Sequence, residues 1–436
     1  MQFMVTAGQP SERRRAGAVA SSVVLSILVL TLLPSAVVRA ATFSVTNILD
    51  TGPGSLRAAI IAANAAPAAD TITFAIPGPG VKTIAPLTAL PNITAPVTIN
   101  GYSQAGASAN TLAVGNDAVL LIELSGALAP AGSDGLRLDT DDSNIRGLVI
   151  NGWKELSSAS DPGGSGIRVL AGADRNVIRG NFIGTNAAGS AAVANEAAGV
   201  RIADASSNDV GGSTPASRNI VSGNLSVGVS ISGDEAIGNR VMGNYIGTNA
   251  AGLAPVANTN GVSINRGADD NVVGGTAAGA RNVISGNSYV GVDVAAPILS
   301  GGVSTDGNVV QGNYIGLNAP GNAAIPNDIG VFLGADGPQD HNVIGGLVPG
   351  SGNTISGNLS YGIHGLHVNG INEIQGNLIG TTPSGEDALG NGSHGISLVD
   401  GSLFSIGHNG VRPQRDLRQW RSRDTGGRGR AHHHRR

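Results

Sequence analysis

The chain of 436 residues has 67 glycines, 3% aromatic and 13% charged side chains, and a net charge of −4. It contains no cysteine, which excludes disulfide and thiol chemistry. Residues 1–40 carry a net charge of +3 and residues 408–436 carry +7, which leaves −14 on residues 41–407. An acidic body argues against a nucleic acid as the partner.

Residues 1–40 have the layout of an export signal. Arg13–Arg15 precede an uncharged stretch from Ala16 to Val38, and Ala40 ends a small-residue cleavage site. The sequence therefore predicts a protein that is secreted or exposed at the cell surface, with no membrane span once the signal is removed. An uncleaved membrane anchor is the alternative, because 23 uncharged residues are long enough to cross a bilayer.

Residues 41–80 are predicted to form an N-terminal cap. The open end of a solenoid exposes unpaired backbone groups and apolar side chains, so a cap with its own helix is expected there. The pattern predicts a strand over Thr42–Thr46, a short helix over about Ser55–Asn64 and a strand over Thr71–Ile76. Further strands are expected near Val97–Asn100, Val119–Leu124 and Gly147–Ile150.

One six-residue phrase, Asn-x-[Ile/Val]-x-Gly-Asn, occurs seven times between residues 176 and 377. Its third position is always aliphatic whereas the neighbouring positions vary, which indicates a strand with one buried face. The Gly-Asn pair suits a tight corner, and stacked corners would let the asparagine amides form hydrogen-bonded ladders. In this alignment Val283 shares a variable position with Arg240 and Glu373, beside the buried Ile284. The copies begin at Asn176, Asn219, Asn239, Asn282, Asn308, Asn353 and Asn372, and shorter Asn-x-[Val/Ile]-Gly-Gly phrases begin at Asn208, Asn271 and Asn342.

The spacing of these phrases predicts the length of the repeating unit. Segments that open at Asn219, Asn239 and Asn260 are 20, 21 and 22 residues long. Such a unit is too short for a strand–helix–strand crossover and suits one coil of a parallel β-helix. Residues 81–407 are therefore predicted to form an all-β, single-stranded parallel β-helix with coils of about 21 residues.

The phrases resemble those of right-handed parallel β-helix repeat proteins of the pectin-lyase-like superfamily, of the bacterial secreted or surface type. The similarity is carried by Asn-Val-Ile-Ser-Gly-Asn at 282–287 and Gly-Asn-Tyr-Ile-Gly-Thr at 243–248. The resemblance implies a right-handed solenoid.

A second resemblance concerns the start of the predicted cap. The segment from Asp50 to Ile60 is similar to the CSLREA motif at the N-termini of such proteins. Ser-Leu-Arg at 55–57 and Ala-Ile at 59–60 match, whereas Gly54 replaces the Cys and Ala58 the Glu of the motif. Together the two resemblances cover about residues 40–407.

The superfamily includes polysaccharide lyases and hydrolases, so the resemblance implies a search for their acidic clusters. The best cluster here, Asp139-Thr-Asp141-Asp142, lies just before Asn144, in the same way that Asp174, Asp269-Asp270 and Asp340 precede other repeat asparagines. That recurrence favours a corner role, as in Asx turns, at positions several coils apart. No catalytic residue, cofactor or metal ligand is therefore predicted, and a row of calcium ions along this edge is the alternative.

Three histidines, His364, His367 and His394, are candidate catalytic groups because Gly-Ile-His-Gly at 362–365 is similar to hydrolase phrases. His394 occupies a position that carries alanine, valine, asparagine or tyrosine in other coils. A position that accepts such variety is expected to face outward and to carry no catalytic role.

Four twelve-residue insertions share one layout, with Gly at the sixth position and an aliphatic residue at the tenth. Three coils apart, they would form a row with a step of roughly 14 Å. Loops on one face commonly carry binding, so the functional interpretation is a multivalent strip for a repetitive ligand such as a glycan chain. The alternative is a structural plug, in which the aliphatic residue packs over the strand beneath it. The insertions are Gly184–Asn195, Gly247–Asn258, Gly316–Asn327 and Gly380–Asn391, and the candidate ligand-binding residues are Thr185, Asn186, Thr248, Asn249, Asn318 and Thr381.

The leading prediction is a secreted or cell-surface β-helix scaffold, monomeric, that binds or adheres without catalysis, with a polysaccharide or cell-surface glycan as partner. One alternative is a carbohydrate-active enzyme of the superfamily, either a polysaccharide lyase or a glycoside hydrolase. Another is a purely structural envelope or stalk protein. Because one fold hosts many functions, only a site can separate them.

Residues 408–436 break every preceding pattern, with nine arginines and no strand period. A basic tail that binds nucleic acid or membrane is one interpretation. We predict instead a disordered segment translated in the wrong frame. A back-translation of residues 407–420, read one base later, permits Gly-Thr-Thr-Ala-Ser-Ala-Arg-Asn-Val-Ile-Ser-Gly-Asn, the phrase expected at this place of the repeat. Resequencing the gene tests this prediction.

Overall fold

The computed structural model describes residues 39–66, 68–156, 158, 161–295, 303–334, 339–368, 370–399, 403–407 and 410–411. All of them belong to one compact unit, Arg39–Arg436. Within these residues no helix has the length and apolar character that crossing a membrane requires. The predicted export signal and basic tail lie outside the described residues, except for positions 39–40 and 410–411.

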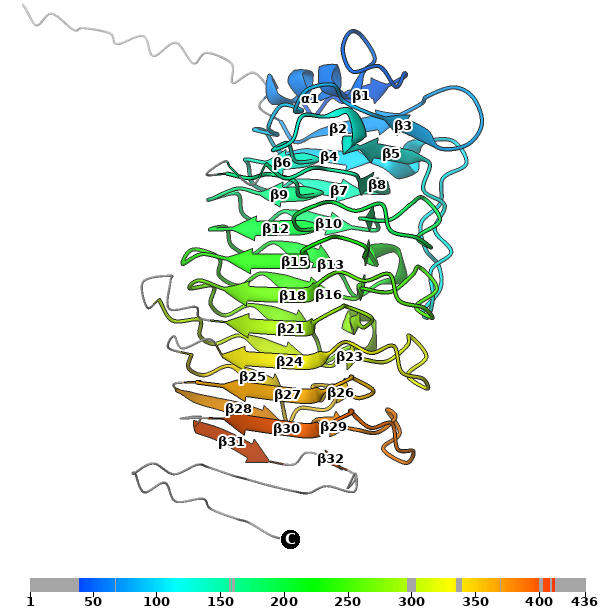
Figure 1. Cartoon of the computed structure of the whole chain (residues 1–436). Coiled ribbons are helices and arrows are strands. Elements are labelled where there is room, and N and C mark those ends of the chain that lie inside the picture. Colours follow the sequence, from blue (N-terminus) through cyan, green and yellow to red (C-terminus); the bar gives the residue numbers. More distant parts are fainter. Residues whose placement is uncertain are drawn as a thin grey trace, which may run out of the picture. The chain divides into compact units, whose positions relative to one another are not determined.

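The strands form three parallel sheets that wind as a right-handed parallel β-helix, which confirms the predicted fold class (Figure 1). Each strand pairs with the strand of the same sheet in the coil before and the coil after. Sheet A contains β1 (Thr42–Val45), β2 (Asp70–Phe74), β4 (Val97–Asn100), β7 (Asn144–Arg146), β10 (Val177–Arg179), β13 (Asp209–Gly211), β16 (Arg240–Met242), β19 (Val272–Gly274), β22 (Val309–Gln311), β25 (Val343–Gly345), β28 (Ile371–Gln375) and β31 (Leu403–Gly407).

The other two sheets complete each coil. Sheet B contains β3 (Lys82–Ile84), β5 (Ile122–Ser125), β8 (Leu148–Asn151), β11 (Phe182–Ile183), β14 (Ile220–Val221), β17 (Tyr245–Ile246), β20 (Val283–Ile284), β23 (Tyr314–Ile315), β26 (Thr354–Ile355), β29 (Leu378–Ile379) and β32 (Gly410–Val411). Sheet C contains β6 (Leu136–Leu138), β9 (Ile167–Val169), β12 (Val200–Ala203), β15 (Val227–Ser232), β18 (Asn260–Asn265), β21 (Val290–Ala295), β24 (Ile329–Gly334), β27 (Tyr361–Leu366) and β30 (His394–Val399). Short 3₁₀ turns occur at η1 (Gly101–Ser103), η2 (Gly126–Leu128), η3 (Pro215–Ser217) and η4 (Ala278–Ala280).

The predicted coil of 21 residues is wrong. The asparagines that stack in neighbouring coils are 31, 32, 37, 34 and 30 residues apart. The six-residue phrase occurs in strands of both sheet A and sheet B. Each segment that opens at Asn219, Asn239 or Asn260 therefore contains two strands, whereas a complete coil contains three. A 63-residue repeat therefore spans two coils, not three.

Stacked aliphatic side chains fill the interior of the solenoid. In sheet A, Val241 pairs with Val273 and Val273 with Val310, and none of the three is exposed. The residues beside them point outward and are partly exposed, as alternation in a strand requires. Burial of one aliphatic residue per strand in every coil supplies the main stabilisation of such a repeat.

Sheet B buries both of its faces from β8 to β20. Ile284 lies in the interior, and its neighbour Val283 is only 3% exposed in a second apolar cluster on the outer face, with Phe182 and Tyr245. Val283 pairs with Tyr245 and Tyr314, not with Arg240 or Glu373, which belong to sheet A. The predicted exposed position of Val283 is therefore wrong, because the phrase recurs in two sheets with different surroundings.

Asparagine ladders run along the axis at all three corners of the coil, as the repeat predicted. Each interior member donates from its side-chain amide to the amide oxygen of the next coil, with N···O distances of 2.9–3.2 Å. The same oxygen also accepts from the backbone N–H of the preceding ladder residue, so both buried groups are satisfied. The ladders are Asn176–Asn208–Asn239–Asn271–Asn308–Asn342–Asn372, Asn181–Asn219–Asn244–Asn282–Asn313–Asn353–Asn377 and Asn195–Asn224–Asn258–Asn287–Asn327–Asn358–Asn391.

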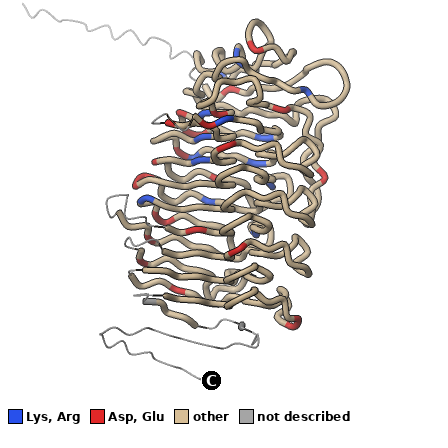
Figure 2. Tube along the Cα trace, in the orientation of Figure 1, with Lys and Arg blue, Asp and Glu red and all other residues tan. Residues whose placement is uncertain are grey.

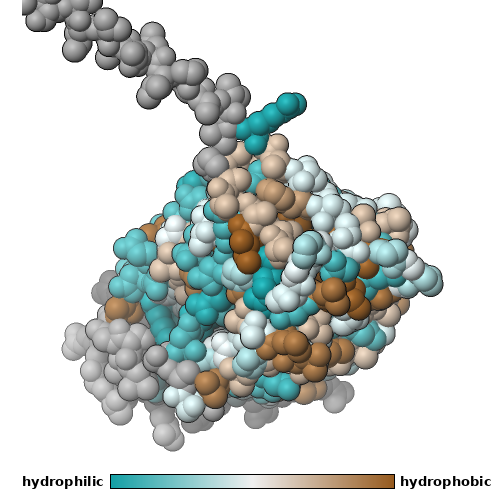
Figure 3. Space-filling view, turned by 90° about the horizontal axis from the view of Figure 1, so that it is seen from above, coloured by the Kyte–Doolittle hydropathy of each residue, from teal (hydrophilic) through white to brown (hydrophobic). Residues whose placement is uncertain are grey.

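The first strands and one helix close the N-terminal end. Helix α1 (Leu56–Asn64) lies where the sequence predicted it, and Ser55 caps it by accepting from the Ala58 N–H. Arg57 donates to the Asp50 carboxylate at 2.6 Å, which ties the preceding loop to the helix. Viewed from this end, polar and apolar side chains are interspersed over the surface (Figure 3).

Strand β5 begins later than predicted, at Ile122 rather than Val119. Val119 instead forms an antiparallel bridge with Ser108, which closes a loop over residues 108–119. This loop runs along the outer side of the solenoid, parallel to its axis, past several following coils (Figure 1).

Candidate functional site

The four insertions form stacked hairpins beside sheet B. Each closes with an antiparallel bridge, such as Thr185 with Ala192 and Thr248 with Pro255. They follow β11, β17, β23 and β29, which are two coils apart, so the step of the row is about 10 Å rather than 14 Å. Neighbouring hairpins touch directly, because Ala250 donates to Gly189 at 2.8 Å and Ala319 donates to Gly252 at 2.9 Å.

The candidate threonines in these hairpins are buried. Thr185 and Thr248 are 0% exposed and Thr381 is 1% exposed. The hydroxyls of Thr185 and Thr248 donate to the carbonyl oxygens of the following asparagines, at 3.1 and 3.2 Å. The three threonine side chains therefore lie inside the hairpins, and their role in ligand binding stays a prediction.

The candidate asparagines cap the same hairpins. Asn186, Asn249 and Asn318 each accept, at 2.9–3.0 Å, from the backbone N–H four residues later. The exposed positions at the tips include small apolar residues, as at Ala188, Ala251 and Pro320, and polar ones, as at Ser190 and Asn322. A binding role for the strip stays a prediction.

The plug interpretation has structural support in the two central insertions. Val256 and Ile325 are 8% and 4% exposed, and their carbonyl oxygens accept from Gly223 and Gly286 of the adjoining coils. Val193 of the first insertion is 39% exposed. The aliphatic residue therefore packs the hairpin against the solenoid in the middle of the row.

The predicted acidic corners stack between sheets C and A. The Asp269 carboxylate accepts from the Asp306 N–H, and the Asp306 carboxylate accepts from the Asp340 N–H, both at 2.7 Å. Burial raises the pKa of Asp269, the Asp306 N–H offsets part of this rise, and the charges of neighbouring aspartates add to it. These carboxylates therefore lie on consecutive coils, and the prediction that they lie several coils apart is wrong. Each carboxylate accepts a hydrogen bond from a backbone N–H at the corner of the next coil. The described residues contain no group of three or more His, Asp or Glu side chains that could hold a metal ion.

The cluster at Asp139–Asp142 also has a structural role. The Asp141 carboxylate accepts from the Asp174 N–H at 2.8 Å, and both Asp141 and Asp142 pair with Arg175. Asp142 and Arg175 adopt left-handed backbone conformations, with φ of 58° and 56°, as a tight corner requires.

The histidines lie at the C-terminal part of sheet C. His364 stacks on Tyr361 with ring centroids 4.5 Å apart, and His394 lies 5.8 Å from the same ring. His394 is exposed, as the sequence indicated, and His367 has φ of 52° in a corner. Burial lowers the pKa of His364, the Ser397 backbone raises it in part, and the charge of His394 lowers it further.

The outward column of sheet C carries several polar and charged side chains that the sequence motifs did not indicate. Its members occupy one register position in successive coils, so they are about 4.8 Å apart. We call this set the sheet C column: Arg137, Arg168, Arg201, Ser230, Ser263, Asp293, Phe332, His364 and Ser397.

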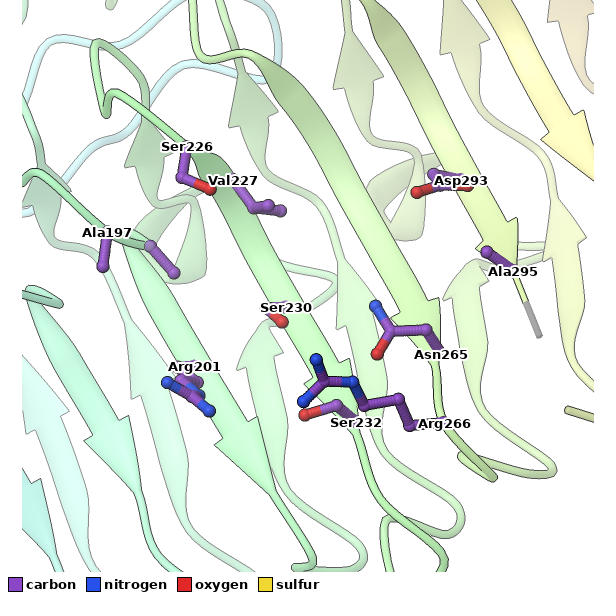
Figure 4. A pocket seen from close by; sticks show the side chains of 11 residues that line it. Ala197, Arg201, Ser226, Val227, Ser230, Ser232, Asn265, Arg266, Asp293 and Ala295 are labelled. Atoms are coloured by element: carbon purple, nitrogen blue, oxygen red, sulfur yellow. The ribbon is translucent and has the colours of Figure 1, made fainter. Parts of the chain in front are cut away.

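A groove of about 360 Å³ lies over the middle of this column (Figure 4). Strands β12, β15, β18 and β21 form its floor. Arg201, Ser232 and Arg266 gather on one side of it, and Asp293 lies apart on the far strand (Figure 4). The groove can therefore offer cationic and hydroxyl donors to one part of a ligand and a single carboxyl group to another.

The arginines of the column differ in their pairing. Arg137 and Arg168 both form ion pairs with Asp134 and Asp161. Within the described residues, the guanidinium groups of Arg201 and Arg266 have no carboxylate within ion-pair distance and no hydrogen bond. Burial lowers the pKa of Arg201, and the charges of Arg168 and Arg266 act in the same direction, while Asp161 and Asp134 oppose them. An anion between Arg201 and Arg266 would relieve this repulsion.

Asp293 is the carboxyl group of the groove. Its Oδ2 accepts from Ser263 at 3.3 Å and from Asn260 at 3.4 Å. Burial raises the pKa of Asp293 to about 6, against the hydrogen bond from Ser263. The side chain therefore changes charge close to neutral pH.

Basic residues are confined to the N-terminal part of the solenoid. Figure 2 shows the Lys and Arg positions in the upper coils and mostly acidic positions below them. Residues 282–411 contain nine Asp and Glu and no Lys or Arg. An anionic ligand is therefore expected to bind the N-terminal half of the sheet C face.

No family model and no curated protein matches the chain. Similar solved structures include the periplasmic alginate epimerase AlgG (12% identity, TM-score 0.39, 80% of this chain and 71% of that chain). They also include pectate lyase Pel9A (14%, 0.38, 86% and 79%) and the Azotobacter vinelandii mannuronan C-5 epimerase AlgE6 A-module (13%, 0.37, 85% and 100%). At this level of likeness the chemistry of these proteins does not extend to this chain, and the fold rests on its own strand pairing.

Proposed function

We propose that the chain is an exported β-helix scaffold that binds an anionic glycan in the sheet C groove and does not change it chemically. The proposal is carried by one observation: Arg201 and Arg266, whose guanidinium groups have no ion-pair partner among the described residues, lie beside Ser232 in one groove. Guanidinium groups bind carboxylate or sulfate groups through charge-assisted hydrogen bonds. The hydroxyls of the groove floor add neutral partners for sugar hydroxyls.

The shape of the site favours a polymer. The column continues along the axis on both sides of the groove, with one outward side chain per coil. An extended chain laid along the axis would meet paired arginines at one end and Phe332, Tyr361 and His364 at the other. Aromatic faces of this kind pack against the apolar faces of sugar rings.

The enzyme alternative has one observation in its favour, the raised pKa of Asp293. A glycosidase needs two carboxyl groups across the scissile bond. Among the described residues that line the groove, Asp293 carries the only carboxyl group, and it makes no ion pair with Arg201 or Arg266. The groove therefore favours binding over hydrolysis, and a stalk with no ligand is the remaining alternative.

Replacing Arg201 and Arg266 by glutamine is expected to weaken binding of polygalacturonate at least tenfold, because two charge-assisted contacts are lost. Isothermal titration calorimetry at low salt measures this change, with a neutral glucan of equal length for comparison. Binding to the unsubstituted protein should weaken as salt rises.

The matched control is Arg240→Gln, since Arg240 lies on sheet A and pairs with Asp209 at 2.7 Å. It should leave the affinity unchanged. Equal losses in all variants would contradict the groove, and no binding of any polyanion would favour the stalk. Release of reducing ends or unsaturated products that stops in Asp293→Asn would show an enzyme.

Binding of polygalacturonate is expected to tighten about fivefold between pH 7.5 and pH 5, because nearby like charges repel by about 1 kcal/mol even in water. The pKa of Asp293, about 6, lies between these two values, so its carboxylate is charged at pH 7.5 and largely neutral at pH 5. Asp293→Asn should bind at pH 7.5 as the unsubstituted protein binds at pH 5. A variant that keeps the full pH dependence would exclude Asp293 as its source.

A further inference from the structure

The same arginine–tyrosine pair is built twice on the outer side of sheet B. The Arg218 guanidinium lies 4.5 Å from the Tyr245 ring centroid, and the Arg281 guanidinium lies 4.2 Å from that of Tyr314. Each arginine directly follows a 3₁₀ turn, η3 or η4, and each tyrosine opens a strand of sheet B, two coils apart. Each tyrosine ring also lies against a glycine of the adjoining hairpin, Gly252 or Gly321.

The first pair is occupied by a loop of this chain. Arg218 donates to the carbonyl oxygens of Leu112 at 3.0 Å and Ala113 at 2.8 Å, and also to that of Gly115. The Tyr245 hydroxyl accepts from the Gly115 N–H at 2.8 Å. Arg218 and Tyr245 are therefore only 7% and 3% exposed. All these hydrogen bonds involve main-chain atoms of the loop, so the pair recognises a peptide backbone and not a side chain.

The loop is preformed for this contact. Asn110 accepts from the N–H groups of Leu112 and Asp117, both at 3.1 Å, and Thr111 donates to Asp117 at 2.6 Å. The ends of the loop meet in the bridge between Ser108 and Val119. A turn closed in this way can present its carbonyl oxygens at little entropic cost.

The second pair is open among the described residues. Arg281 donates through Nε to Gly312 at 3.2 Å and makes no further hydrogen bond or ion pair there. The Tyr314 hydroxyl has no partner in that part of the chain, and both side chains are partly exposed. The third copy of the layout has Gly352 and Leu378 instead of arginine and tyrosine, so the pair is not a general requirement of the coil.

We propose that the Arg281–Tyr314 pair is a docking site for a peptide turn of a partner polypeptide, held through its main-chain carbonyl oxygens and one N–H. The loop that binds the first pair indicates which kind of ligand the second pair can bind. Arg281 is also the last Lys or Arg before residues 282–411, a segment that contains nine Asp and Glu and no Lys or Arg. This surrounding charge opposes a polyanion and favours neutral carbonyl acceptors.

The probe is a head-to-tail cyclic peptide of residues 108–119, labelled and titrated into the full chain by fluorescence anisotropy. Saturable binding at one site is expected. Arg281→Ala and Tyr314→Leu should each weaken it about tenfold or more, because a charge-assisted contact or its aromatic support is lost. A peptide N-methylated at Gly115 should also bind more weakly, since it lacks the N–H that the tyrosine accepts.

Two controls keep the result decisive. Arg218→Ala should leave peptide affinity unchanged, whereas a loss there would mean that the peptide displaces the chain's own loop. Arg281→Lys, which keeps the charge, should retain the circular dichroism spectrum and lose binding, because lysine lacks the planar fork. The proposal fails if the peptide does not bind at millimolar concentration, if Arg281→Ala binds normally, or if polygalacturonate displaces the peptide from the same site.

Discussion

Replacing Val273 by aspartate is expected to lower the free energy of unfolding by roughly 3–5 kcal/mol, the range for an unpaired charge in an apolar core. Val273 is 0% exposed and stacks between Val241 and Val310 in the interior of sheet A. No cation lies inside the solenoid among the buried core residues to pair with the new carboxylate. Urea unfolding followed by circular dichroism measures the change.

Val272→Asp is the matched control, one residue away on the same strand. Val272 is partly exposed and shares its register position with Arg240, so a carboxylate there can pair with that arginine. Its expected cost is below about 1 kcal/mol, as for most exposed positions. Equal costs at Val272 and Val273 would contradict the register of sheet A. Val283 is unsuitable as a control because it is buried on the outer face of sheet B.

The strand pattern was predictable because it is local. The third residue of the repeated phrase is buried at Ile178, Val241 and Ile374, and most of the ladder asparagines belong to the same phrase. The coil length was not predictable from the phrase alone, because Asn219 and Asn239 open strands of different sheets. Only the pairing of Asn208 with Asn239 shows where a coil closes.

The candidate site was harder to predict because its residues come from several coils. Arg201, Ser230, Ser263 and Asp293 each occupy the third position of a Gly-aliphatic-x-aliphatic phrase. Reading that variable position down the chain would have given the sheet C column. The sequence indicated the hairpins instead, because insertions are conspicuous in a repeat. The burial of residues such as Thr185 depends on the stacking of neighbouring hairpins, which the sequence alone does not show.

Replacing Asn282 by alanine is expected to destabilise the solenoid by about 3–5 kcal/mol, because several buried polar groups lose their partners at once. The Asn282 amide oxygen accepts from the Asn244 side chain at 3.2 Å and backbone at 2.9 Å. Its amide nitrogen donates to Val241 at 2.7 Å and to Asn313 at 2.9 Å. Each buried group left without a partner costs about 1–3 kcal/mol, and a cavity of this size does not restore all four contacts with water.

Asn322→Ala provides the comparison, since Asn322 is an exposed residue whose side chain accepts, among the described residues, from Asn318 alone. Its expected cost is below about 1 kcal/mol. Thermal and urea unfolding of both variants test the difference, and hydrogen exchange should show the loss spreading to the coils that contain Asn244 and Asn313. The ladder transmits the defect because each amide satisfies its neighbours on both sides. Similar costs for Asn282 and Asn322 would mean that the ladders follow the stacking of the coils without stabilising it.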